Sequence, residues 1–254
     1  GETLFGDSNN SELTVGVSWF QIWGKLGYSS SSISFTRTRY KYRFHKTAMA
    51  TDFLDNRSLD EVLHLRNSNH FTLGGSDRVT FGFGIDLLGS RYDYRSAPHS
   101  NAYGQAVPEV RKNIGSEGSK AHLFIDYSAQ IGSSISLNLG IRGDYFSYSR
   151  SVRVSPRFSA AFRINDRARI SFAAGYFRQT LPLLLLYQNP DNRTLTEPLA
   201  YQYSAGLDYR FSESVKLKVS GYYKDYRHLP LDPSQPSLCL LDDMFGFSLF
   251  RDMA

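Results

Sequence analysis

The sequence predicts an all-β chain: a segment of an antiparallel transmembrane β-barrel, with about ten strands out of roughly 22 in a larger barrel. Three observations predict this fold class. Apolar and polar residues alternate with a period of two, short turns alternate with long polar connections, and aromatic residues gather where the expected strands end. Residues 1–254 are expected to form one partial barrel domain.

The alternation is clearest in residues 78–94, where Val79, Phe81 and Phe83 share one face while Thr80, Gly82 and Asp86 share the other. Several segments with this pattern reach the ~9–11 residues that a tilted strand needs to cross a bilayer. The expected strands lie near residues 12–19, 28–44, 59–71, 78–94, 120–130, 135–148, 157–164, 169–177, 201–210 and 215–226.

The connections between these strands differ in length on the two sides. Short turns are expected at residues 74–77, 131–134, 165–167 and 211–214, with a longer one at 20–27. Long outer loops are expected at residues 45–58, 95–119, 178–200 and 227–254, and only 149–155 is short on that side. Outer-membrane barrels sort their connections in this way, so we expect the bacterial outer membrane as the location and its lipid as a partner.

Aromatic residues are expected to form a girdle at each rim, because their rings favour the membrane interface. Trp19 and Trp23 flank one short turn. The residues expected at the long-loop rim are Tyr40, Tyr42, Phe44, Tyr92, Tyr94, Tyr145, Phe146 and Tyr148. Within residues 37–46 cations alternate with rings, and we expect these cations to point towards the lumen or towards lipid phosphates.

The composition excludes several other classes of protein. The single Cys239 excludes a disulfide framework, and the six histidines have no partner at metal-ligand spacing, so we expect no metal and no cofactor. No apolar run approaches the ~20 residues of a membrane helix. No nucleophile elbow or phosphate-binding loop is present, which argues against an enzyme. The net charge of +5 is spread along the chain, and no second basic patch supports nucleic-acid binding.

Residues 155–230 resemble the middle barrel of TonB-dependent receptors. The order and spacing of several short elements together carry this resemblance. The matching elements are Ser155-Pro156-Arg157, Gly175-Tyr176, Asn189-Pro190, Glu197-Pro198, Tyr203 with Gly206, Tyr222 to Asp225, and Leu229-Pro230.

The resemblance implies energised uptake of a scarce solute, such as an iron chelate, cobalamin, glycan or peptide. It also implies a plug domain inside the barrel and a TonB energy-coupling complex as partners. The chain shows no match to a plug, to a TonB-contacting segment or to a terminal strand that ends on an aromatic residue, so we expect those parts outside it.

Two groups of candidate site residues follow from the resemblance. Solute contacts are expected in the loop at 178–200, from Arg178, Gln179, Tyr187, Gln188, Asn189, Asp191 and Asn192. Charged residues expected to face the lumen or a plug are Arg142, Asp144, Arg169, Asp208 and Arg210. Charges buried in a filled lumen need partners, which a plug would supply.

Two alternative functions stay open at this stage. One is a passive, porin-like barrel, which an upstream sequence without a plug would favour. The other is a soluble or surface-exposed β binding module, which recovery without detergent would favour.

Overall fold

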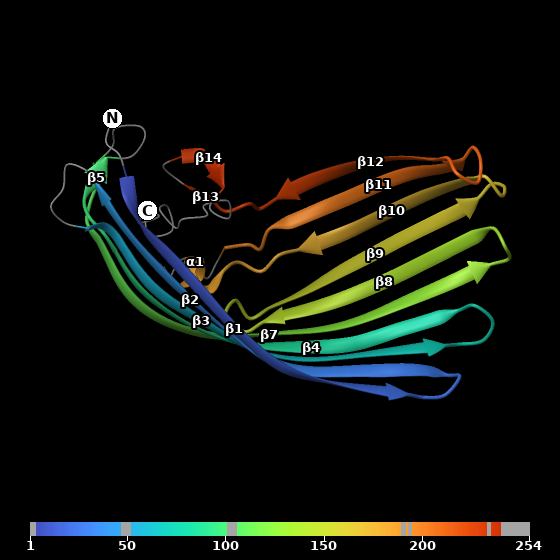
Figure 1. Ribbon diagram of the computed structural model, residues 1–254, viewed down its shortest axis with the longest axis horizontal. Helices are drawn as coiled ribbons and strands as arrows, with labels where there is room; N and C mark the ends of the chain where they lie inside the picture. Colours follow the sequence, from blue (N-terminus) through green and yellow to red (C-terminus); the bar gives the residue numbers. More distant parts are fainter. Residues whose placement is uncertain are drawn as a thin grey trace.

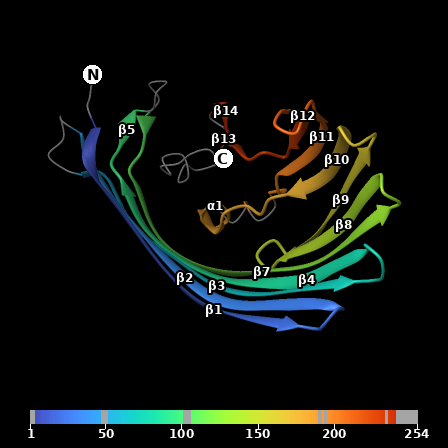
Figure 2. The ribbon, with the colours of Figure 1, turned by 45° about the vertical axis from the view of Figure 1, so that its right-hand side comes forward.

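A single curved sheet of ten antiparallel strands forms the body of the molecule (Figures 1 and 2). The computed structural model describes residues 4–46, 52–100, 106–188, 192, 195–232 and 235–239. The strand order is β1-β2-β3-β4-β7-β8-β9-β10-β11-β12. Within the described residues β1 and β12 do not pair with each other, so the sheet is an open trough rather than a closed barrel. The predicted fold class is confirmed.

The strands fall into a long set and a short set. The long strands are β1 (Leu4–Ile22), β2 (Gly27–Lys46), β3 (Asp52–Thr72), β4 (Arg78–Ser96) and β7 (Val110–Ile131). The short strands are β8 (Ile135–Phe146), β9 (Ser151–Arg163), β10 (Ala168–Arg178), β11 (Leu199–Arg210) and β12 (Lys216–Arg227). The short set matches the length of a tilted membrane-spanning strand, whereas the long set is about twice that length.

Smaller elements lie at the long-loop end. They are the paired strands β5 (His99–Ser100) and β6 (Ala106–Val107), the helix α1 (Leu183–Gln188), and the paired strands β13 (Leu231–Asp232) and β14 (Gln235–Cys239). In the described part of the chain, helical structure long and apolar enough to cross a membrane is not found.

The predicted outer loops at 45–58 and 95–119 are wrong in extent. β3 begins at Asp52 and β7 at Val110, so much of both stretches is paired strand. Polar composition suggested loops there, but a hydrogen-bonded ladder satisfies the backbone whatever the side chains are. The ion pair of Arg43 with Asp52 (3.3 Å) links the extended ends of β2 and β3. The expected loops at 178–200 and 227–254 contain α1 and the β13–β14 pair, and residues 240–254 lie outside the described part.

The register gives the convex face of the sheet an apolar band. Ile33, Leu65 and Ile85 pair in one row across β2, β3 and β4, and Phe35, Leu63 and Leu87 pair in the next row. Phe81, Phe83 and Leu87 on β4 are 41%, 37% and 50% exposed, which is unusual for large apolar side chains in water but normal against lipid. Further members of the band are Val15, Val17, Leu123, Ile125, Leu139, Ile141, Phe158, Phe172, Leu207 and Val219.

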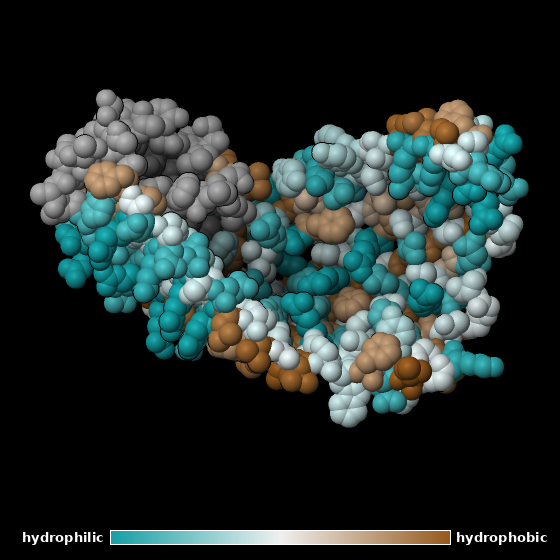
Figure 3. Space-filling view, viewed as in Figure 1, coloured by the Kyte–Doolittle hydropathy of each residue, from teal (hydrophilic) through white to brown (hydrophobic). Residues whose placement is uncertain are grey.

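The concave face carries the alternate, mostly polar residues, and Figure 3 shows mainly hydrophilic residues in the hollow of the trough. An apolar cluster interrupts this face at the long-loop end. It consists of Phe146 on β8 with Leu181, Leu183 and Leu186 in and before α1. The apolar run of residues 181–186 therefore holds a short helix against the inside of the wall.

The two rims carry the aromatic girdles differently from the prediction. At the short-turn rim Trp19 is 69% exposed, and the Tyr127 hydroxyl donates a hydrogen bond to Asp77 (2.6 Å) in the β3–β4 turn. Glycines with positive φ close the neighbouring turns, for example Gly132 (φ 58°). At the long-loop rim the expected girdle is wrong for most residues, because strand parity points them to the concave face. Tyr40, Tyr42, Phe44, Tyr92, Tyr94 and Phe146 face inwards, Tyr148 packs beside α1, and Tyr145 faces outwards.

Candidate functional site

A polar hollow on the concave face, at the level where the short strands end, is the best-formed candidate site. We call it the wall pocket, and its volume is about 250 Å³. It lies between strands β4, β7, β8 and β9 and the segment that follows β10. Its lining residues are Asp86, Lys120, His122, Arg142, Asp144, Tyr145, Phe146, Arg153, Arg178, Gln179, Thr180 and Glu197.

Ion pairs fix two sides of the wall pocket. On β8, Arg142 and Asp144 lie two residues apart on one face, and Arg142 Nη2 is 2.7 Å from Asp144 Oδ1. On β9, Arg153 Nε is 3.1 Å from Glu197 Oε2, while Ser151 donates to the other carboxylate oxygen at 2.8 Å. The Glu197 side chain is only 6% exposed, so these two donors compensate its burial. These two contacts attach the Glu197-Pro198 segment to strand β9.

Two further charged residues lie on the opposite side of the pocket. Asp86 has cationic partners, whereas Lys120 has no carboxylate partner among the described residues. Asp86 Oδ1 is 2.7 Å from His64 Nδ1 and 3.8 Å from Arg66 Nη2. Lys120 Nζ lies 5.4 Å from the centre of the Phe146 ring, a cation–π contact. Within the described residues no carboxylate lies within ion-pair distance of Lys120.

Arg178 borders the wall pocket, but the register puts its side chain on the face of the sheet that carries Tyr176 and Tyr201, which is the convex face. Arg178 ends β10, its guanidinium lies 5.1 Å from the Tyr176 ring, and Nη2 donates to the Tyr176 hydroxyl. Arg178 Nη1 is buried and lacks a hydrogen-bond partner among the described residues. A buried N–H without an acceptor is costly, so this group favours an acceptor supplied from outside the described chain, such as a carbonyl or carboxylate oxygen.

The structure brings four of the predicted site residues together and separates the others. Arg142, Asp144, Arg178 and Gln179 all line the wall pocket. Arg169, Asp208 and Arg210 lie at the other end of β10 and β11, next to the short turns, where Asp208 is 3.7 Å from Lys216.

The remaining predicted residues belong to the segment around α1. Tyr187 donates to the Glu117 carbonyl (3.0 Å), and its ring is tilted against that of Tyr148, with ring centres 4.6 Å apart. Gln188 is the last residue of α1, and Asn192 is 4% exposed. Asn189 and Asp191 lie outside the described residues.

The sequence pattern did not predict Asp86, Lys120, His122, Arg153 and Glu197 as site residues. The period-two pattern already placed Asp86 on the polar face of its strand, and this was the available signal. The pairing register, which sequence alone does not fix, aligns Asp86 with Lys120 and His122 with Asp144. A metal-binding group of three or more histidine, cysteine or acidic residues is absent from the described part of the chain.

A hydrogen bond inside the extended wall strengthens the long strands beyond the pocket. The Tyr92 hydroxyl donates to Asp60 Oδ1 at 2.9 Å across β3 and β4. Burial, together with the charge of Asp60, raises the pKa of the Tyr92 phenol above its usual value. The phenol therefore stays protonated as a donor at physiological pH.

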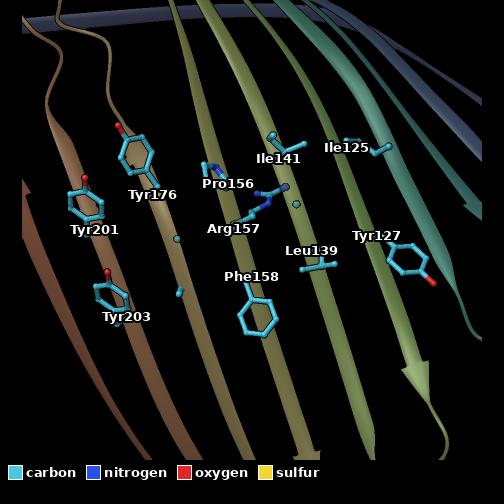
Figure 4. Close-up of a pocket in the computed structure, with 13 residues that line it drawn as sticks. Ile125, Tyr127, Leu139, Ile141, Pro156, Arg157, Phe158, Tyr176, Tyr201 and Tyr203 are labelled. Carbon is cyan, nitrogen blue, oxygen red and sulfur yellow. The ribbon is translucent and has the colours of Figure 1, made fainter.

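A second, larger hollow lies over the convex face and differs in chemistry (Figure 4). Its volume is about 630 Å³, and Figure 4 shows Tyr176, Tyr201 and Tyr203 on one side with Leu139 and Ile141 on the other. Ala174 and Gly175 leave the space between them open. Because this groove belongs to the apolar band, it suits lipid chains rather than a polar solute.

Comparison with family models identifies the protein family to which this chain belongs. A family model described as "TonB dependent receptor-like, beta-barrel" matches residues 3–239. The chain belongs to this TonB-dependent receptor barrel family. Barrels of this family lie in the bacterial outer membrane, and so does this one. No curated protein matches the chain.

Solved structures agree with this TonB-dependent receptor barrel in fold. A variant of the ferric enterobactin receptor PfeA from Pseudomonas aeruginosa is 14% identical with a TM-score of 0.66, covering 87% of this chain and 35% of that one. The copper transporter OprC is 10% identical with a TM-score of 0.68, covering 86% and 39%. The outer membrane transporter YddB from Escherichia coli is 13% identical with a TM-score of 0.64, covering 88% and 35%. The chain thus spans well under half the length of these relatives.

Proposed function

We propose that this chain forms part of the barrel wall of a receptor that takes up a scarce solute across the outer membrane, with energy supplied through TonB. The observation that carries the proposal is the wall pocket, where Lys120 lies beside two ion pairs and has no carboxylate within ion-pair distance among the described residues. This polar pocket lies on the face of the sheet opposite the lipid-facing band, which is where transported material or a plug domain would pass.

The residues of the pocket would have two different roles, hydrogen bonding to the bound molecule and stiffening of the wall. Lys120 and Gln179 would donate hydrogen bonds to carbonyl or carboxylate oxygens of a plug or solute, and Arg178 stays a proposed solute contact at the end of β10. The pairs Arg142–Asp144 and Arg153–Glu197 would hold the wall rigid around them. The proposed contacts outside the pocket are Tyr187, Gln188, Asn189, Asp191 and Asn192 for the solute, and Arg169, Asp208 and Arg210 for the plug.

The class of solute is open between an iron chelate, cobalamin, a glycan and a peptide. Metal-bearing solutes are the first to assay, because the relatives include a ferric enterobactin receptor and a copper transporter.

The test uses the full-length receptor in cells that lack their own receptors for the solute. Uptake of radiolabelled ferric chelates, copper and cobalamin is measured with and without a working TonB complex. We expect uptake to require TonB and Lys120→Ala to weaken it about 10- to 100-fold, as the loss of a charge-assisted hydrogen bond predicts.

Two controls make the test specific. Lys120→Arg keeps the charge and is expected to retain part of the uptake, and Arg163→Ala removes an exposed arginine at the short-turn end of β9 without effect. The amount of receptor on the cell surface is measured for each variant. Uptake that is equal without TonB would refute energised transport and favour a passive pore.

A further inference from the structure

Strand β7 has a free edge where it extends beyond its neighbour β8. It runs over Val110–Ile131, but β8 pairs only with residues 120–131 of it. Figure 1 shows the long strands continuing past the end of β8 towards the left of the view. Among the described residues, no strand pairs with the outer half of β7 on the side away from β4. We call residues 110–116 on this side the β7 edge.

The backbone of the β7 edge presents unpaired hydrogen-bonding groups. In an antiparallel sheet a strand bonds to each neighbour through alternate residues. The Ser119 carbonyl accepts a hydrogen bond from the Ser147 amide (2.9 Å). The Glu117 carbonyl accepts one from the Tyr187 hydroxyl (3.0 Å), so the odd-numbered residues of β7 point away from β4. The odd-numbered residues of the β7 edge, whose N–H and C=O groups lack a partner within the described residues, are Arg111, Asn113 and Gly115.

This row of free groups fits an extended polypeptide. Residues that face the edge recur every ~6.6 Å along the strand, and each offers one donor and one acceptor. A second extended chain repeats the complementary groups at the same spacing, whereas a glycan or a metal chelate does not. The three residues with free groups are exposed, so a strand can add to the β7 edge by β-augmentation.

The concave side of the β7 edge favours an apolar side chain on the added strand. Ile114 packs there against the buried cluster of Phe53, Leu54 and Tyr94. Directly opposed Cβ atoms of two paired strands lie ~4.5–5.5 Å apart. An apolar side chain opposite Ile114 would therefore extend that cluster by one strand.

Opposite charges flank the β7 edge on its convex side. Arg111 pairs with Arg95, which is engaged by Glu109 at 3.2 Å. Within the described residues no acid lies within ion-pair distance of Arg111, and the exposed Glu117 at the other end likewise has no cation there. Gly115 leaves room for a base opposite it that reaches Glu117. On an antiparallel strand, an acid four positions later would lie opposite Arg111.

We propose that the β7 edge binds an extended segment of an extracellular polypeptide, which adds to the wall as an antiparallel strand. The long-loop end of an outer-membrane barrel faces the outside, so the edge is open to secreted and cell-surface proteins. A second copy of the receptor does not fit, because the axis that relates two antiparallel β7 edges is normal to the wall and would invert one copy relative to the membrane. The inference rests on the membrane location and does not depend on the transport proposal.

The test measures binding of a synthetic peptide to the full-length receptor in an uncharged detergent, by fluorescence anisotropy. The peptide Thr-Lys-Val-Thr-Thr-Glu-Val would place its second, fourth and sixth residues opposite Gly115, Asn113 and Arg111. N-methylation of its fourth and sixth residues removes N–H groups that face β7, whereas N-methylation of its third and fifth removes N–H groups that face away. Each lost hydrogen bond costs about fivefold, so we expect the first peptide to bind about 25-fold more weakly and the second to keep its affinity.

Two receptor variants test the same hydrogen bonds from the side of the wall. Asn113→Pro removes an N–H that faces the peptide and leaves the ladder with β4 intact, so we expect about fivefold weaker binding. Asn113→Ala loses the same side chain but keeps the N–H, and is expected to bind normally. Melting temperatures report the folding of both variants, and the methylated peptides test the wild type independently. Hydrogen exchange at Asn113 and Gly115 is expected to be fast in the free receptor and slow with peptide bound.

Four outcomes would overturn the proposal. They include no binding at about 1 mM peptide, and equal binding of the two methylated peptides. Slow exchange at Asn113 and Gly115 in the free receptor would show that another part of the receptor already covers the edge. Receptor dimers that Asn113→Pro separates would assign the edge to a second copy instead.

Discussion

Replacing Phe83 by arginine is expected to destabilise the membrane-inserted receptor by ~2–4 kcal/mol. Phe83 lies at the centre of the apolar stretch of β4, between Val79 and Leu87, and is 37% exposed on the convex face. Its row partners are Asn67 on β3 and Leu123 on β7. The guanidinium would therefore enter lipid near the midplane of the bilayer, where the cost of a charge is largest.

The same substitution at Val79 is expected to cost only ~0–1 kcal/mol. Val79 is the second residue of β4, directly after the short turn, so an arginine there reaches the interface. Ser34→Arg serves as a control on the concave face at the height of the band. Ser34 pairs with Gly16 and His64, and a new side chain meets polar surroundings there.

The assay is reversible unfolding of the full-length receptor by guanidinium chloride in lipid vesicles, followed by tryptophan fluorescence. The free energies of unfolding are compared at a fixed lipid composition. Wild-type stability in Phe83→Arg, or an equal loss in Ser34→Arg, would refute the assignment of the convex face to lipid.

Three further perturbations test other parts of the wall. Gly27→Ala is expected to destabilise more than Gly132→Ala in the same unfolding assay, because a Cβ at Gly27 would lie 1.9 Å from the His70 carbonyl oxygen whereas Gly132 has open space around it; equal losses would contradict the tight approach of β2 to β3. Tyr92→Phe is expected to cost ~1.5–3 kcal/mol by removing the hydrogen bond to the Asp60 carboxylate, and Asp60→Asn with Tyr92→Phe in a double-mutant cycle measures the coupling, which vanishes if the bond is absent. Glu197→Gln is expected to cost ~1–3 kcal/mol, since it weakens the contacts of a buried carboxylate with Arg153 and Ser151; an unchanged melting temperature would show that the segment before β11 is not anchored there.

The sequence predicted the membrane-spanning part of the sheet well, because one physical constraint acts on it. A strand between lipid and a polar interior must alternate, and residues 79–87 do so without exception. The turn residues were also informative, since Gly75 and Gly132 need a left-handed backbone that few other residues adopt.

The outer part of the wall was harder to predict for a physical reason. Beyond the membrane both faces of a strand meet water or other protein, so polarity no longer separates strand from loop. Tyr92 and Tyr94 were assigned to a girdle because they stand at a strand end, but parity and pairing put them on the concave face, where Tyr94 packs with Phe53 and Leu54. Only some of the residues that line the wall pocket were predicted. The others depend on the pairing register of the strands, which places Lys120 opposite Asp86.

The extension of β2, β3, β4 and β7 beyond the band has a thermodynamic consequence. These strands cross the interface without a break in their ladders, so the outer wall is ordered before anything docks on it. Fixing the backbone of a free loop costs about 1–2 kcal/mol of conformational entropy for each residue. A molecule that binds the concave side of this extended wall avoids most of that loss, and its affinity can come from few contacts.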